Sequence, residues 1–201
     1  MPIVSAITAT PRDPGRFDIS VDGRSLATLS LDSIERLGLA VGGSIAGLEE
    51  RISHEAAALR VYDRALDVLA FRSRASRELE RSLVQKGEPP DLVVRAIARL
   101  TEQGLLDDAA FAESFTRARV LGAQQSKRRV RQELARRGVA RDVSEVAIVT
   151  VFREEEVHER EVVERAARKK LATLRKLEPT VRRRRLYGFL ARRGYDGDDI
   201  R

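Results

Sequence analysis

The sequence contains no cysteine, and only 4% of its residues are aromatic. Without cysteine there is no disulfide, no thiolate metal site and no cysteine nucleophile. With so few aromatic side chains, the core has to be built from Leu, Val, Ile and Ala, which we expect to lie on helices. The hydrophobic content of 42% is enough for such a core, and 201 residues suit one or two domains.

Long apolar runs are also missing. No stretch approaches the run of about 18 apolar residues that indicates a membrane span, and no apolar segment follows a basic start. We therefore expect neither a transmembrane helix nor a signal peptide. Together with the absence of cysteine, this predicts a cytoplasmic protein.

Signals of an enzyme active site are equally scarce. The sequence has no glycine-rich phosphate loop, no serine elbow and no histidine with metal-ligand spacing. Two acidic groups remain, Glu154–Glu156 followed by His158, and Asp107-Asp108. Both are typical of helix starts, because carboxylates favour the first turn and cap its free amides. We expect no enzyme, no metal ion and no cofactor; a nuclease built on Asp107, Asp108 and Glu113 is the weakest alternative.

Helical patterns dominate most of the chain, most clearly between residues 72 and 111. Apolar residues recur there every three or four positions, which places them on one side of a helix. Gly87 closes the first helix, and the prolines after it cannot continue it. We expect Asp91 to cap the second helix, which ends at Gly104. The segment thus predicts a helix, a tight turn and a second helix.

The same pattern returns twice. Two aliphatic residues four positions apart are followed by a cation and a glycine at residues 79–87, 130–138 and 186–194. The closing glycines lie 51 and 56 positions apart, a period typical of helical arrays. The alternative is that each motif is an ordinary helix end, since Gly and Lys/Arg favour C-termini. We favour tandem helical repeats and a mainly α fold.

The N-terminal part has a different character. Residues 3–10 are rich in β-branched side chains, residues 17–21 alternate between apolar and polar, and Asp22-Gly23 is a strong hairpin signal. We expect two or three antiparallel strands that pack on a short helix over residues 32–37. This short helix ends at Gly38.

These patterns predict how the chain is divided. We expect a small β-rich extension at residues 1–50 and helical repeats at residues 51–109, 110–153 and 154–201. The third repeat is expected to begin with one helix from Glu154 to Leu177, continue with a helix capped by Thr180, and stop one helix short of a full repeat.

Positive charge is clustered along the chain. The sequence has 38 Lys and Arg against 31 Asp and Glu, a net charge of +7. Ser126 is expected to cap a helix that turns Val130 and Leu134 inward and its cations outward. Such clusters attract polyanions or acidic protein surfaces, although a solvated face balanced by nearby Glu is the alternative. The predicted basic surface consists of Lys86, Lys127, Arg128, Arg129, Arg131, Arg136, Arg137, Arg168, Lys169, Lys170, Arg182, Arg183, Arg184, Arg185, Arg192 and Arg193.

Several of these residues also resemble a known family. The first repeat and the elbow Leu105-Leu106-Asp107-Asp108-x-x-Phe111-Ala112 are similar to the signature of the RecX regulatory proteins. The spacing of Gly122, Ser126 and Gly138 continues the match. The resemblance is good over about residues 60 to 152 and looser over about 155 to 195. One departure is Ala75, where the family usually has a capping Ser.

The resemblance implies both a fold and a function. It implies tandem three-helix repeats in an elongated, curved molecule, which we expect to be monomeric. It also implies a non-enzymatic regulator that binds the RecA protein and its filament on single-stranded DNA, inhibits its recombinase, ATPase and co-protease activities, and binds DNA weakly through the basic surface.

A stand-alone DNA-binding protein or transcriptional repressor is the alternative function. Its recognition helix would be Arg128–Arg137, placed in the major groove of duplex DNA. Such a protein would gain from a dimerisation element and a single recognition helix. The sequence instead spreads cations over several repeats and shows no dimer heptad, so we favour the regulator.

Overall fold

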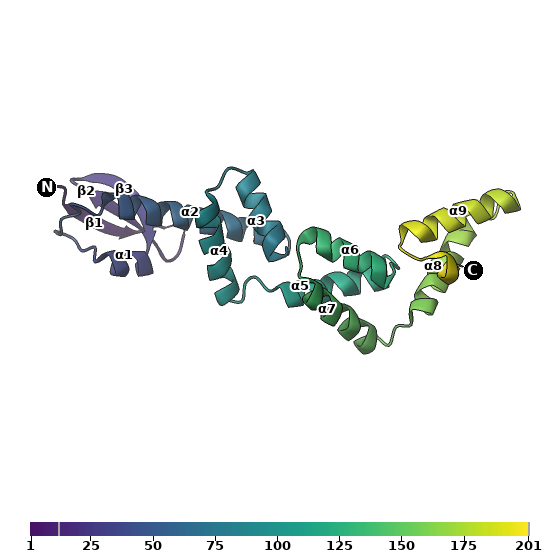
Figure 1. Cartoon of the computed structure of the whole chain (residues 1–201). Helices are drawn as coiled ribbons and strands as arrows, with labels where there is room; N and C mark the ends of the chain where they lie inside the picture. The colour runs from purple at the N-terminus through teal and green to yellow at the C-terminus, as the bar shows by residue number, and fades with distance from the viewer. Residues whose placement is uncertain (12, 201) are drawn as a thin grey trace. The chain divides into compact units, whose positions relative to one another are not determined.

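The computed structural model describes residues 1–11 and 13–200, and it is mainly helical with a small sheet at the N-terminus (Figure 1). The strands are β1 (Val4–Ala9), β2 (Arg16–Val21) and β3 (Arg24–Ser30). The helices are α1 (Leu31–Leu37), α2 (Glu49–Phe71), α3 (Ser76–Gln85), α4 (Pro90–Glu102), α5 (Asp108–Arg117), the π-helical turn η1 (Ala118–Gly122), α6 (Lys127–Arg137), α7 (Arg141–Glu154), α8 (Glu159–Thr173), α9 (Pro179–Arg192) and α10 (Gly197–Ile200).

The chain forms two compact units. The N-terminal unit contains Met1–Arg72 and Glu80–Glu102, and the C-terminal unit contains Ser73–Leu79 and Gln103–Arg201. Helix α3 therefore contributes its first turn to the C-terminal unit and its remainder to the N-terminal unit. We refer to α2–α4 as repeat 1, to α5–α7 as repeat 2 and to α8–α10 as repeat 3.

The N-terminal sheet is an antiparallel meander in the order β1-β2-β3. Asp22 and Gly23 join β2 to β3 with positive φ angles of 49° and 81°, as a two-residue hairpin turn requires. One face of the sheet buries Ile19 and Leu29 against α1 and the start of α2, where Ile52 is fully buried. The predicted hairpin, the antiparallel strands and the short helix before Gly38 are confirmed.

Helix α2 extends beyond the sheet and packs against α4 of repeat 1. Gly87 and Gly104 end α3 and α4 in the left-handed conformation, with φ angles of 90° and 68°, as predicted. The prediction that Asp91 caps α4 was wrong. The helix begins one residue earlier, at Pro90, because proline is well suited to the first helical position.

A single hydrophobic core runs through the C-terminal unit. Val130 and Leu134 of α6 are fully buried, as predicted, and they share this core with Ile148 of α7 and with Val162 and Leu190 of repeat 3. Val146 of α7 lies outside this core. Its side chain is 64% exposed, because Ala147, Ile148 and Val151 are the residues that turn inward.

The first helix of repeat 3 begins later than predicted. Helix α7 runs through Glu154, and α8 begins only at Glu159, so no single helix covers Glu154 to Leu177. The break is a Schellman turn, in which Glu156 has a φ of 49° and the N–H of Val157 donates to the carbonyl of Phe152 at 3.0 Å.

The second and third helices of repeat 3 also differ from the prediction. Thr180 is not the cap of α9, which begins at Pro179 after Glu178. After Gly194 the chain forms the short helix α10, which the prediction lacked. The carboxylate of Asp196 accepts hydrogen bonds from the N–H groups of Asp198 and Asp199, each at 3.0 Å, and so caps this helix.

Candidate polyanion-binding surface

The cations of α6 have partners inside the C-terminal unit. Ser126 caps the helix as predicted, accepting from the N–H of Arg129 at 3.2 Å. The Arg129 guanidinium then pairs with Glu133 at 2.9 Å, one helical turn later. Arg131 makes a two-pronged contact with Glu145 of α7, and this hydrogen bonding raises the pKa of Arg131. Arg131 therefore joins α6 to α7, whereas the pair of Arg129 stays within α6.

Two further cations join repeat 2 to repeat 3. Nε of Arg128 donates to the carbonyl of Gly194 at 3.0 Å, and Nε of Arg193 donates to the carbonyl of Ala123 at 2.9 Å. Burial lowers the pKa of Arg193, whose guanidinium also lies 3.9 Å from the centre of the Phe189 ring. Both side chains are thus committed to the joint between the repeats.

The joint is completed by contacts beside these arginines. The hydroxyl of Tyr195 donates to the carbonyl of Gln124 at 3.0 Å, and burial raises the pKa of this tyrosine well above its ordinary value. Gln124 has a φ of 53°, which is uncommon for a residue other than glycine. On α6, the ammonium of Lys127 lies 4.4 Å from the centre of the Phe152 ring.

At the other end of α6, Arg137 contacts the first turn of α3, which belongs to the same C-terminal unit. Its guanidinium lies 4.7 Å from the centre of the Phe115 ring and 3.9 Å from the carboxylate of Glu78, in the first turn of α3. Arg136 beside it is exposed, and so is Lys86 after the end of α3 in the N-terminal unit. Much of the α6 cluster is therefore structural, and Lys86 belongs to the other unit.

Repeat 3 presents its positive charge differently. Residues 165–185, which we call the basic segment, contain ten Lys and Arg and one carboxylate, that of Glu178. This surplus of nine exceeds the net charge of +7 for the whole chain, so the other 180 residues carry 28 cations and 30 carboxylates. The positive character of the protein therefore resides in this segment.

The cations of the basic segment face solvent with little neutralisation. Arg168, Lys169, Arg183, Arg184 and Arg185 are exposed, whereas Lys170 and Arg182 are half-buried. Within the described residues, Arg168 is the member with an ion pair, to Glu164 at 3.3 Å. Because Arg168 is 81% exposed, that pair contributes little.

Helices α8 and α9 carry the basic segment and pack against each other (Figure 1, yellow-green and yellow). One side of α9 packs inward through Leu186, Phe189 and Leu190, which are three or four positions apart. The opposite side, which includes Arg184 and Arg192, is exposed. The local sequence thus fixes which arginines remain available to a partner.

The acidic groups considered as possible chemistry have structural roles. Asp107 caps α5 by accepting from the N–H groups of Ala109 and Ala110, which confirms the predicted role. Glu154 and Glu155 pair with Arg117 of α5 at 3.0 and 2.5 Å. Among the described residues, no group of His, Asp and Glu side chains has an arrangement that could hold a metal ion.

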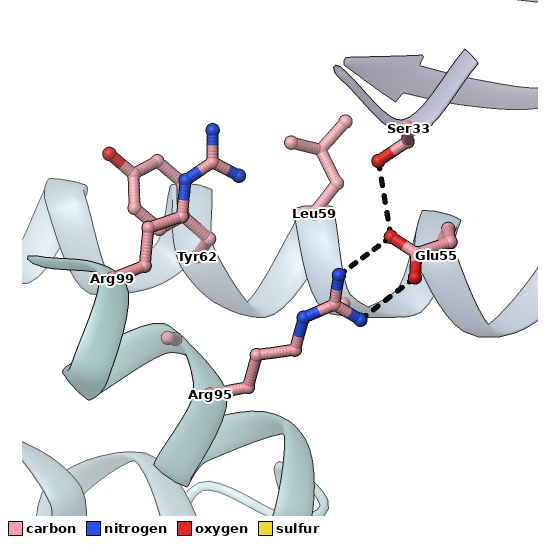
Figure 2. Close-up of a pocket in the computed structure, with 8 residues that line it drawn as sticks. Ser33, Glu55, Leu59, Tyr62, Arg95 and Arg99 are labelled. Carbon is pink, nitrogen blue, oxygen red and sulfur yellow. Dashed lines mark hydrogen bonds and ion pairs between the residues drawn. The ribbon is translucent and has the colours of Figure 1, made fainter. Parts of the chain in front are cut away.

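A carboxylate cluster in the N-terminal unit was missed by the sequence analysis (Figure 2). Glu55 of α2 accepts from Arg95 of α4 at 2.9 and 2.8 Å, from Arg36 at 2.6 Å and from Ser33 at 3.1 Å. The cavity beside it has a volume of about 20 Å³, room for about one water molecule. The only sequence signal was a carboxylate close to the buried side of α2, and the cluster joins the N-terminal sheet module to repeat 1.

Among the described residues, no helix has the length and apolar character needed to cross a membrane. Three family models match the chain in order. They are RecX, first three-helix domain, at residues 62–100; RecX, second three-helix domain, at residues 107–148; and RecX, third three-helix domain, at residues 158–201.

Individual relatives and solved structures agree with these models. A protein named Regulatory protein RecX from Mycolicibacterium smegmatis is 40% identical over 136 residues, covering 65% of this chain and 70% of that protein. Another of the same name, from Halalkalibacterium halodurans, is 30% identical over 164 residues, covering 79% and 62%.

The fold comparison extends over nearly the whole chain. A crystal structure of regulatory protein RecX matches with a TM-score of 0.79 and 21% identity, covering 99% of this chain and 97% of that one. The crystal structure of RecX from Lactobacillus salivarius matches with a TM-score of 0.58 and 19% identity, covering 72% and 92%. With three matching domains in order and relatives at 30 to 40% identity, the chain belongs to the RecX family of regulatory proteins.

Proposed function

We propose that this protein is a non-enzymatic regulator that binds the RecA filament on single-stranded DNA and inhibits its recombinase, ATPase and co-protease activities. Membership of the RecX family supports a regulatory role. The observation that carries the proposed mode of binding is the basic segment, which has a surplus of nine positive charges and exposes most of its cations to solvent. A nucleoprotein filament is a polyanion, and clustered Arg and Lys side chains bind phosphates by releasing condensed counterions.

The two groups of cations are expected to play different parts. Those of α6 hold the repeats in place, whereas Arg183, Arg184 and Arg185 are available to the filament. Among the four consecutive arginines, Arg182 and Arg185 are three positions apart on the helix and repel each other by some tenths of a kcal/mol. An anionic partner removes this repulsion, so part of the binding free energy is stored in the free protein.

ATP hydrolysis by RecA on single-stranded DNA, titrated with this protein at constant salt and with DNA in excess, tests the proposal. We expect inhibition well below one protein per RecA subunit, which simple competition for DNA does not produce. Replacing Arg183, Arg184 and Arg185 together with Ala should weaken inhibition. The matched control replaces Arg24, Arg51 and Arg60, three exposed arginines of the N-terminal unit, and should inhibit like the wild type.

One result would count against the proposed mode of binding, and another would count against the regulator itself. Equal loss of inhibition in both triple variants would mean that net charge, and not the basic segment, determines binding. No inhibition at any ratio, together with tight binding to duplex DNA, would favour a stand-alone DNA-binding protein.

A further inference from the structure

The outward side of α9 combines an exposed aromatic ring with unpaired arginines. Tyr187 is 51% exposed, and within the described residues its ring and hydroxyl have no partner. The other two tyrosines, Tyr62 and Tyr195, are buried. Arg183 and Arg184 precede Tyr187 by four and three positions, so all three side chains lie on the same side of the helix. No contact within the fold explains why a ring is kept there.

Gly188, the next residue, is also unexplained by the fold. It lies in the middle of α9, and glycine is among the weakest helix formers. Its φ is not positive, so the backbone does not require glycine. A Cβ atom placed on it would meet Nη1 of Arg192 at 3.5 Å, an ordinary contact, and no other atom within 4 Å. Packing therefore does not require glycine either.

Three residues of α9 are involved, and we call Tyr187, Gly188 and Arg192 the seat. Tyr187 supplies an aromatic face, Gly188 leaves the helix backbone open beside it, and the guanidinium of Arg192 lies next to Gly188. A flat group can approach the backbone closely where no side chain projects. Tyrosine rings and arginine planes are the side chains on which unpaired bases stack.

We propose that this side of α9 binds single-stranded nucleic acid directly, with an unpaired base stacked on Tyr187 over Gly188 and backbone phosphates against Arg183 and Arg184. The inference rests on the proposed function. Weak DNA binding is already implied by the family resemblance, and what is new here is the place on α9 where an unpaired base would stack. Duplex nucleic acid fits less well, since its bases already stack on one another. An acidic protein surface would use the arginines but has no need of the ring.

Four single variants of the 201-residue protein test the seat, with a fluorescein-labelled oligo(dT) of about 20 nucleotides as the probe and fluorescence anisotropy at low salt. Removing a stacked aromatic weakens single-strand binding by about 5- to 150-fold. We therefore expect a loss of that size for Tyr187→Ala and none for Tyr187→Phe. The matched control is Phe71→Ala, which removes an 88% exposed ring of the N-terminal unit and should bind like the wild type.

Gly188→Ala separates binding from folding. Alanine is the better helix former and has room at this position. We expect this variant to melt at a higher temperature than the wild type and yet to bind the oligonucleotide more weakly. If Gly188→Ala binds the oligonucleotide as tightly as the wild type does, the glycine is not needed for a base to approach the helix, and the proposed binding site is wrong.

Other outcomes also overturn the inference. Wild-type affinity in Tyr187→Ala would exclude stacking, and tighter binding to a duplex of the same length would exclude preference for a single strand. Competition by poly-glutamate that displaces the oligonucleotide equally from Tyr187→Ala and the wild type would favour an acidic protein partner.

RecA assays with the same variants keep the two proposals apart. If the wild type inhibits RecA but Tyr187→Ala binds oligo(dT) normally, the proposed regulatory function is supported and the proposed stacking site is wrong. If oligo(dT) binding depends on Tyr187 but the wild type leaves RecA unaffected, the proposed stacking site is supported and the proposed regulatory function is wrong.

Discussion

The carboxylate of Glu159, the first residue of α8, accepts a hydrogen bond from the backbone N–H of Lys127, the first residue of α6, at 2.9 Å. The preceding joint is built in the same way. Asp108, the first residue of α5, accepts from the N–H of Ser76, the first residue of α3, at 2.7 Å. In both joints an acid that begins one repeat caps the middle helix of the repeat before it. This explains how α3 begins after Ala75, a residue with no capping oxygen.

Loss of either acid should loosen its joint. Replacing an N-terminal capping side chain with Ala costs about 0.5 to 2 kcal/mol, so Glu159→Ala and Asp108→Ala are each expected to lower the free energy of unfolding by about that amount. Urea denaturation followed by circular dichroism measures it. Glu161→Ala, an exposed acid in the same turn as Glu159, is the control. Equal losses in Glu159→Ala and Glu161→Ala would assign the effect to the helix dipole alone.

The closing glycines predict a second difference in stability. Gly87 and Gly138 have nearly the same φ, 90° and 89°, so alanine at either position costs about 1 to 2 kcal/mol of backbone strain. A Cβ on Gly87 would meet nothing within 4 Å, whereas one on Gly138 would lie 2.5 Å from Cβ of Arg77. Gly138→Ala should therefore lose more stability than Gly87→Ala in urea. Equal losses would show that the end of α6 can move away from Arg77 of α3 without a further loss in the free energy of unfolding.

The Glu55 cluster predicts a pH dependence. Burial by itself raises the pKa of Glu55, but hydrogen bonds from Arg95 and Ser33 and the charge of Arg36 outweigh burial, and the pKa falls below its ordinary value of 4.5. Stabilisation from a lowered carboxyl pKa is complete above the unfolded value and is lost as the pH falls through the folded one. Glu55→Gln should cost about 1 to 3 kcal/mol at pH 7.

Urea denaturation between pH 3 and 7 measures this dependence. The gap between wild type and Glu55→Gln should be widest near neutral pH and close progressively below pH 4.5, the ordinary value. Asp67→Asn, an exposed acid on the same helix, should show no such gap. A gap that is constant with pH would mean that the carboxylate charge is not what stabilises the cluster.

Removing the arginines of α6 and removing those of α9 should change the stability of the protein in different directions. Replacing Arg128, Arg129 and Arg131 together with Ala deletes contacts to Gly194, Glu133 and Glu145, and we expect a loss of about 1 to 3 kcal/mol. Replacing Arg183, Arg184 and Arg185 deletes only like-charge repulsion, so stability should stay constant or rise by some tenths of a kcal/mol. Urea denaturation of both triple variants gives the comparison. A destabilised second variant would reveal contacts within the basic segment.

Salt dependence gives a count of phosphate contacts. For single-stranded DNA, the log–log slope of affinity against salt is about −0.7 per phosphate neutralised. Removing Arg183, Arg184 and Arg185 should therefore reduce the magnitude of the slope by about 2 if each contacts a phosphate. Titrations at several salt concentrations with the triple variant and the wild type measure the change. An unchanged slope would place the phosphates elsewhere.

Local sequence signals predicted the parts of this fold that depend on neighbouring residues. The hairpin at Asp22-Gly23, the left-handed glycines and the Ser126 cap all follow from backbone preferences over a few positions. Two helix starts were misplaced by one or two residues for a common reason. Pro90 and Pro179 were interpreted as breaks before a helix, whereas each is the first residue of one.

The candidate site was harder to predict, because an arginine's partner is set by the tertiary structure. Arg128 meets Gly194 and Arg193 meets Ala123, 66 and 70 positions away in the chain. The same holds for Asp108 and Glu159, which are helix starts by sequence and joint residues by structure. The basic segment was easier to recognise, because its excess of charge is present within 21 consecutive residues.

The two joints have a consequence for how such a chain evolves. Each uses an acid at the start of one repeat, a glycine at the end of its middle helix, and the first turn of the preceding middle helix as the receiving surface. Every repeat in the middle of the series therefore carries two sets of contact residues, one for the repeat before it and one for the repeat after it. A gene duplication that copies one repeat also copies both sets of contact residues. A chain can therefore gain or lose whole repeats without a new interface having to evolve.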